Sequence, residues 1–338
     1  MICLSKANII NVARRSFSST RVHFVRFRGT SASTPEFAEI GKICASKKEG
    51  LYQPGQLFLH RVFAYRGVIV CSFNVKVQGN PKINEAIGTS EILPYYQVLV
   101  NRDDWDYMNF RPDMTSYFVD SSVNREEKIL NVIHGMDCVP HNEILPFTTV
   151  NKNPINHDLF PRLFEFSSEP SIEADVNFNI RRDLVPHFGL TNQRSWLAPQ
   201  AVYKESTENI QVTVIPYFLG MTFSGGQQKY NWRYVVRLES LDRKPVVIRE
   251  RLIKIFSMNN LQQVAGHGVD GANPRLTAEN PAFQFSSVVD LLQPKGGHMW
   301  GRFTMERQDG STFEISIPTI ALECHNEMIG EQSEQSRQ

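Results

Sequence analysis

Three glycines in the C-terminal third of the chain have the spacing of a phosphate-binding loop. The stretch Gly266-x-Gly268-x-x-Gly271 matches, letter by letter, the loop that holds the pyrophosphate of a dinucleotide. That fingerprint needs a strand before it and a helix after it, whereas Pro274 and Pro281 follow here without a helical pattern. A dinucleotide-binding fold is therefore not expected.

The same glycine loop has two further interpretations. Successive glycines can turn several backbone N–H groups toward an anion, so Gly266, Gly268 and Gly271 form a candidate anion or ligand loop. The carboxylate of Asp270 would repel such an anion. A tight turn without a ligand is the favoured interpretation, and binding of a phosphate-type ligand is the alternative.

A second candidate for chemistry is His141-Asn142-Glu143, which has the H-x-E spacing of a zinc deaminase. No P-C-x-x-C sequence follows, and flanking prolines favour a turn. The motifs G-x-S-x-G, H-E-x-x-H and G-x-x-x-x-G-K-[ST] do not occur, and the 5 cysteines contain no C-x-x-C pair. We therefore expect a protein that is not an enzyme and that has no cofactor and no metal.

A third candidate combines cations with aromatic rings, as surfaces that bind nucleic acid do. It consists of His60, Arg61, Tyr65 and Arg66, a possible partner or nucleic-acid patch. Residues 36–150 carry 11 basic and 14 acidic side chains, however, so this region as a whole is acidic. The favoured interpretation is that Arg61 and Arg66 pair with local acids beside a turn, and direct DNA binding is the alternative.

The stretch from Gln211 to Phe218 matches the peptide pattern by which proteins bind a sliding clamp. Such a peptide acts as an exposed turn, whereas Val212 and Val214 alternate with polar residues as in a buried strand. We expect a strand here, and clamp binding, if any, through another surface.

The first 35 residues differ in charge from the rest of the chain. They hold 6 basic residues and no acid, the composition of a mitochondrial transit peptide. On a helix, one face would carry the apolar residues Ile9, Ala13, Phe17, Phe24 and Phe27. We expect residues 1–35 to direct the protein to the mitochondrial matrix, with cleavage between Phe17 and Ser33 and the nucleus as a second location. A disordered basic tail, or an arm for nucleic acid, is the alternative.

The charge and hydropathy of the remainder exclude two classes of protein. After residue 35, 30 basic residues face 35 acidic ones, so the folded part does not have the positive charge of a protein held on DNA mainly through phosphates. No stretch approaches the roughly 20 apolar residues that cross a bilayer, so no membrane span is expected.

Short apolar runs with turn residues between them predict strands on either side of a connector. Residues 50–150 read as a small barrel with a polar insertion at 101–135, and residues 201–325 as a two-sheet sandwich. Residues 151–200 read as a short helical connector with helices over 158–166 and 171–185. Residues 326–338 read as a disordered tail.

Both β regions resemble known families. The run from Tyr52 to Val70, followed by Leu93 to Val100, is similar to the YccV family, also called hemimethylated-DNA-binding or HspQ-like, which implies an SH3-like barrel. The glycine loop, Gly297-His-Met-Trp-Gly301 and the run from Asp309 to Pro318 resemble the ApaG family, which implies a fibronectin type III or immunoglobulin-like sandwich. Asp270 departs from the ApaG pattern, which usually has a hydrophobic residue there.

The two domains in this order behind the leader resemble a family of mitochondrial and partly nuclear interaction proteins. That resemblance implies a non-catalytic adaptor whose partners are DNA polymerase subunits, replication factors or a matrix protease. The nucleic-acid or phosphate-ligand module described above remains the alternative function.

Overall fold

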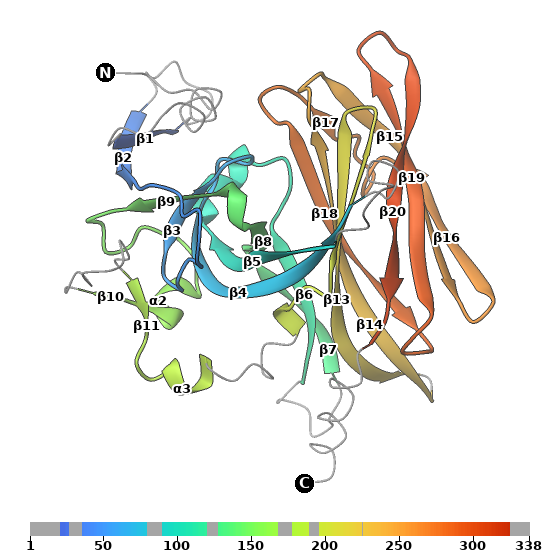
Figure 1. The fold of residues 1–338 in the computed structure, drawn as a ribbon, viewed down its shortest axis with the longest axis horizontal. Coiled ribbons are helices and arrows are strands. Elements are labelled where there is room, and N and C mark those ends of the chain that lie inside the picture. The colour runs from blue at the N-terminus through green and yellow to red at the C-terminus, as the bar shows by residue number, and fades with distance from the viewer. Residues whose placement is uncertain are drawn as a thin grey trace. The chain divides into compact units, whose positions relative to one another are not determined.

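The computed structural model describes residues 21–26, 36–79, 90–119, 128–167, 178–188, 196–224 and 226–324. Strands make up almost all of the regular structure, which confirms the all-β class (Figure 1). The chain divides into two compact units. The first comprises Met1–Asn74, Pro94–Met108 and Gly135–Gly189, and the second comprises Val75–Leu93, Asn109–His134 and Leu190–Gln338.

The first unit is built from short strands in the order β1-β2-β9-β3-β4, and β5 pairs with both β4 and β8. Their bounds are β1 (Arg21–Arg26), β2 (Glu36–Ile43), β3 (Leu57–His60), β4 (Arg66–Gln78), β5 (Glu91–Val100), β8 (Met136–Pro140) and β9 (Ile144–Thr148). All four residues of β3 are buried, as expected for a strand with neighbours on both sides and both faces covered. The core includes Tyr52, Phe58, Val68, Tyr96 and Phe147.

The connector is less helical than the sequence pattern predicts. The helices α2 (Phe160–Leu163) and α3 (Val185–Phe188) are four residues long, and β10 (Phe164–Phe166) pairs antiparallel with β11 (Phe178–Ile180). The expected helices over 158–166 and 171–185 are wrong where they overlap these strands, and 171–177 lies outside the described residues. The alternate aromatic residues explain the difference, because Phe164 and Phe178 are buried and Phe166 packs against Phe178 across the ladder.

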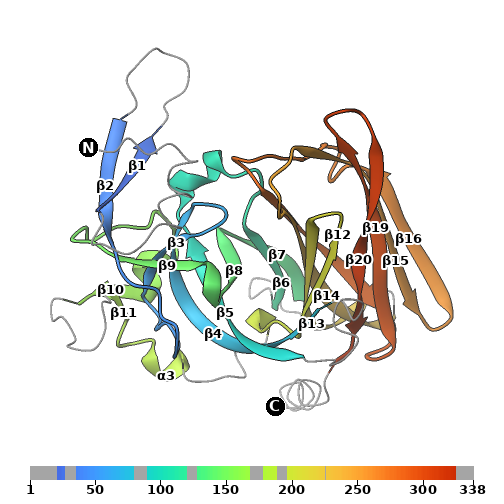
Figure 2. The same ribbon diagram turned by 45° about the horizontal axis from the view of Figure 1, so that its top comes forward.

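The second unit contains a two-sheet sandwich. One sheet has the order β12-β13-β14-β18, and β12 also pairs in parallel with the end of β4. The other has the order β16-β15-β19-β20 (Figure 2), and β17 pairs with β15. The bounds are β12 (Val202–Thr207), β13 (Ile210–Ser224), β14 (Gln227–Ser240), β15 (Val246–Ser257), β16 (Asn260–His267), β17 (Arg275–Leu276), β18 (Ala282–Leu291), β19 (Gly297–Arg307) and β20 (Thr312–Leu322).

Buried apolar side chains from both sheets form the core of the sandwich. Trp232, Val236 and Leu238 of β14 are buried, as are Phe303 and Met305 of β19. The two sheets meet where the ring of Phe285 in β18 lies 6.3 Å from that of Phe303, edge to face. The predicted sandwich is therefore confirmed.

The insertion at 101–135 carries regular structure that its polar composition concealed. It begins with the 3₁₀ helix η1 (Arg102–Tyr107) in the first unit. It continues in the second unit as a hairpin of β6 (Asp113–Val119) and β7 (Lys128–His134).

The leader is described only at residues 21–26, where β1 pairs with β2. Phe24 lies opposite Ala38 in this ladder, so the expected helix does not extend to it. The rest of the leader and the tail 326–338 lie outside the described residues. None of the described helices is long and apolar enough to cross a membrane.

Candidate functional site

The glycine loop begins at Gly266 near the end of β16 and continues into the connection to β17, and its three glycines differ in their surroundings. Gly268 and Gly271 have φ of +57° and +78°, the left-handed region that favours glycine. A Cβ at Gly268 would clash with the carbonyl of Ala272, whereas one at Gly271 would meet open space. A Cβ at Gly266 would lie 3.9 Å from Nε of Arg251, so the arginine side chain runs along this glycine.

Hydrogen bonds to backbone carbonyls occupy three N–H groups of the loop. Gly268 donates to the carbonyl of Arg249 at 2.6 Å, while Val269 and Ala272 each donate to the other's carbonyl at 2.9 and 3.0 Å. An Oδ1 atom of Asp270 lies 3.8 Å from Nη1 of Arg251. This geometry favours a closed turn over an anion nest, because three of the donors are already satisfied.

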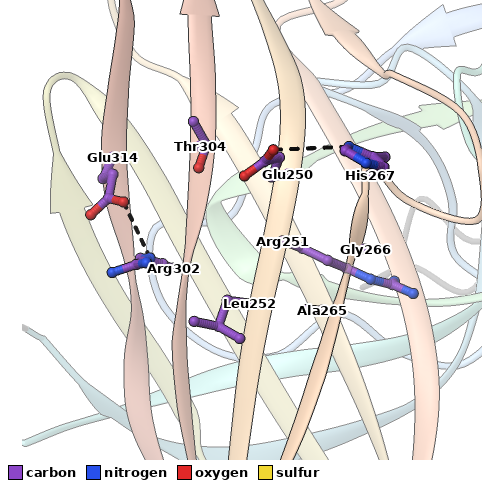
Figure 3. Close-up of a pocket in the computed structure, with 9 residues that line it drawn as sticks. All are labelled: Glu250, Arg251, Leu252, Ala265, Gly266, His267, Arg302, Thr304 and Glu314. Atoms are coloured by element: carbon purple, nitrogen blue, oxygen red, sulfur yellow. Dashed lines mark ion pairs between the residues drawn. The ribbon is translucent and has the colours of Figure 1, made fainter.

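A shallow pocket of about 500 Å³ lies beside the loop on strands β15, β16, β19 and β20 (Figure 3). It is lined by Glu250, Arg251, Leu252, Ala265, Gly266, His267, Arg302, Thr304 and Glu314. Within it, Glu250 faces His267 at 3.9 Å and Arg302 faces Glu314 at 3.2 Å. Arg302 and Glu314 are thus paired with each other, and no serine or cysteine lines the pocket as a nucleophile.

An ion pair next to the pocket holds β15 against β19. Arg249 donates through Nε to Glu306 at 2.6 Å and through a terminal nitrogen at 2.9 Å. These hydrogen bonds lower the pKa of Glu306 below its usual value, so the carboxylate stays charged. No group of three or more His, Cys, Asp or Glu side chains that could hold a metal occurs in the described parts of the chain.

The structure buries half of the predicted basic and aromatic patch. The His60 side chain is 1% exposed, accepts hydrogen bonds from the N–H groups of Val62 and Phe63, and lies 3.2 Å from Glu143. Tyr65 is 0% exposed and donates its hydroxyl to Asp137 at 2.7 Å. A partner could not reach either ring, so the four residues do not share one exposed surface.

The two arginines of that patch lie at the turn that connects β3 and β4, and each bonds to another segment of the chain. Arg66 donates to Asp104 through a terminal nitrogen at 2.6 Å, through Nε and through its backbone N–H, and Asp104 is 1% exposed. Arg61 donates through Nε to the carbonyl of Asn142 at 3.0 Å, and its backbone N–H bonds to Glu143. The expected pairing with a local acid is seen for Arg66, and Arg61 bonds to two main-chain carbonyls.

His141 and Glu143 lie in the single-turn 3₁₀ helix η2 (His141–Glu143). Nε2 of His141 lies 2.9 Å from the carbonyl of Lys47, so this nitrogen carries the proton. Nδ1 therefore accepts from the hydroxyl of Tyr96 at 2.8 Å. Both ring nitrogens are used within the protein, which fits a structural turn.

The stretch Gln211–Phe218 lies within β13 and pairs with β14 over its whole length. Val212, Val214, Tyr217 and Phe218 are buried. The predicted strand is confirmed, and these side chains are not exposed as a clamp-binding peptide would be.

Strand β16 is exposed along its whole length, and the sequence pattern does not predict it. All 8 of its residues are exposed, including Leu261 and Val264. The signal was present: the run Asn-Leu-Gln-Gln-Val-Ala-Gly has strand character but no charge and no proline. Alternation alone could not find it, because neither face of the strand is covered.

Two family models match the chain. The model described as "Hemimethylated DNA-binding protein YccV like" matches residues 51–168. The model of the ApaG domain matches residues 222–307, within the second unit.

Comparison with characterised proteins extends the match over most of the chain. Polymerase delta-interacting protein 2 of Homo sapiens is 35% identical over 331 residues, covering 92% of this chain and 86% of the relative. The Mus musculus protein of the same name is 37% identical, covering 85% of this chain and 80% of the relative. Protein ApaG of Paramagnetospirillum magneticum is 33% identical over 37% of this chain and 96% of its own length.

Proposed function

The chain belongs to the polymerase delta-interacting protein 2 family, and we propose from this membership that it is a non-catalytic adaptor of the mitochondrial matrix. Its partner is a DNA polymerase subunit, with replication factors and a matrix protease as further partners. The nucleus is a second location.

The observation that carries this proposal is the similarity to relatives whose name describes an interaction with polymerase delta, over 85–92% of this chain. The geometry of the described residues supports it. Within each unit, charged side chains pair with each other, as Arg66 does with Asp104 in the first unit and Arg249 with Glu306 in the second.

A direct binding measurement tests the adaptor role. The full chain without its leader is titrated against purified polymerase delta, and against its separate subunits, by calorimetry. We expect saturable binding to one subunit. Absence of binding to every subunit would refute the polymerase as partner.

The location is tested separately, by N-terminal sequencing of the protein from purified mitochondria. The basic, acid-free leader supports cleavage of the chain at a bond between Phe17 and Ser33, which would remove the residues before that bond. A protein recovered with Met1 intact, or absent from mitochondria, would contradict this part of the proposal and leave the polymerase measurement standing.

Binding of nucleic acid is the second candidate function. Its support is the name of the YccV-like model that matches residues 51–168. The burial of His60 and Tyr65 removes the aromatic part of the surface first considered for it.

A further inference from the structure

We propose that β16 is a dimerisation edge, through which a second copy of this chain adds its own β16 to extend the sheet. The strand ends the order β16-β15-β19-β20, and no strand among the described residues pairs with its other side. Figures 1 and 2 both show β16 at the outer border of its sheet. This inference goes beyond the adaptor role and does not depend on it.

The turn before β16 determines which backbone groups face outward. β15 and β16 are joined by Met258-Asn259, whose φ angles of 51° and 60° are those of a type I′ turn. The flanking residues Ser257 and Asn260 are therefore a hydrogen-bonded pair. From this pair, hydrogen-bonded and non-hydrogen-bonded residue pairs alternate along the ladder. The bond from the N–H of Gly268 to the carbonyl of Arg249 fits this alternation, because Gly268 lies an even number of residues from Asn260.

The alternation leaves every second residue of β16 with its N–H and C=O directed away from β15. These residues are Leu261, Gln263, Ala265 and His267. An outward row of this kind is a template for another strand. Proteins usually block such an edge with lysine, proline or a bulge, and the run from Asn260 to Gly266 has none of these.

The occupant that the strand fits best is its own copy. No charged residue occurs from Asn260 to Gly266, so two copies do not repel each other along the edge. Leu261 and Val264 are 45% and 42% exposed and lie on opposite faces, so pairing would cover apolar surface on both. A twofold arrangement also closes after two copies, whereas an open edge left unpaired invites aggregation.

One antiparallel register uses the whole edge. With the twofold axis at Val264, Leu261 lies opposite His267 of the second copy and Gln263 lies opposite Ala265, so every outward-facing residue finds a partner. Val264 then faces Val264 of the second copy in a non-hydrogen-bonded pair, where Cα atoms are about 4.5 Å apart.

The register also supplies a partner for Arg251. Its side chain runs along Gly266, and its Nε is buried without a hydrogen-bond partner in the described structure (Figure 3). The residue opposite Gly266 is Gln262 of the second copy, whose amide oxygen is an acceptor. A longer side chain at Gly266 would block this approach.

The first test is sedimentation equilibrium of the full chain over a range of micromolar concentrations. We expect a reversible dimer. Val264→Lys should raise its dissociation constant by about tenfold or more, because two ammonium groups would face each other. Leu292→Lys is the matched control, since Leu292 is a similarly exposed aliphatic residue away from β16, and it should leave the constant unchanged.

The second test locates the axis. Val264→Cys should form a disulfide between two copies under mild oxidation, because side chains directly opposite in such a pair are close enough for one. Leu292→Cys and the unmodified chain should not form this disulfide.

The proposal is overturned by a monomer at all concentrations, by a dimer that Val264→Lys leaves intact, or by a β16 whose amides become protected from hydrogen exchange only when a different protein is added.

Discussion

Gly268 is the residue of the glycine loop that tolerates a side chain least. We expect Gly268→Ala to lower the free energy of unfolding by about 1 kcal/mol or more, because φ is +57° and the Cβ would meet the carbonyl of Ala272. Urea unfolding measures the change. Gly266→Ala is the control, since its Cβ would make an ordinary contact, and it should change stability little.

The same loop allows a test of the anion interpretation. If it is a turn only, calorimetry should detect no phosphate binding, and Asp270→Val should not create any. Phosphate binding by the unmodified chain that becomes tighter in Asp270→Val would show that the N–H groups of the loop accept an anion after all.

Asp104 is the buried partner of Arg66. Replacing it with asparagine should destabilise the first unit by about 3 kcal/mol, since it leaves the mostly buried guanidinium without its counter-charge. Thermal unfolding checks this. Asp158→Asn is the control: its pair with Arg102 is exposed on both sides, and solvent already screens it, so little change is expected. Equal effects of both substitutions would contradict the argument.

Cys324 makes the stability of the fold depend on pH in the alkaline range. Burial raises the pKa of its thiol from 9.0 to about 11. The unfolded chain therefore forms thiolate first, so this contribution to stability is complete below pH 9 and is lost as the pH rises toward 11. The free energy of unfolding should therefore be lower at pH 10 than at pH 8, and the difference should be smaller in Cys324→Ala.

At pH 8, iodoacetamide should modify the less buried Cys44 before Cys324.

At the scale of elements, the hairpin β6–β7 is attached to the sandwich by a buried arginine. Arg233 is 1% exposed, its guanidinium lies 4.1 Å from the ring centroid of Tyr217, and it donates to the carbonyl of Thr115 at 2.8 Å. We expect Arg233→Ala to speed hydrogen exchange throughout 113–119 and 128–134, because the hairpin loses this attachment.

The control for the hairpin is Arg237→Ala on the same strand. Arg237 pairs with Glu239, two residues away, at 3.1 Å. Its removal should leave exchange in β6 and β7 unchanged. If Arg233→Ala leaves that exchange unchanged too, the attachment of the hairpin rests on other contacts.

At the scale of the whole molecule, the net charge predicts weak binding to DNA. Beyond residue 35 the chain has 30 basic and 35 acidic residues. We expect the processed protein to bind a labelled duplex weakly, with no preference for hemimethylated DNA, when anisotropy is followed at about 50 and 200 mM salt. Tight binding that falls steeply between these concentrations would instead favour the nucleic-acid function.

Much of the architecture was readable from local pattern. Alternation at period two predicted the sandwich strands, including the one that contains Gln211 and Phe218. Proline after the glycine loop excluded a helix there, and β17 follows instead. These features depend on residues close together in sequence, which is why sequence alone was sufficient for them.

Other features depended on what packs against a segment, which no local pattern records. His60 and Tyr65 look like surface residues until Asp137 and Glu143, more than 70 residues away, are placed beside them. The aromatic spacing that resembled a helix at 158–166 instead continues into a strand beside Phe178. Only the tertiary structure shows that Leu261 and Val264 of β16 are exposed, because burial is a property of neighbours distant in sequence.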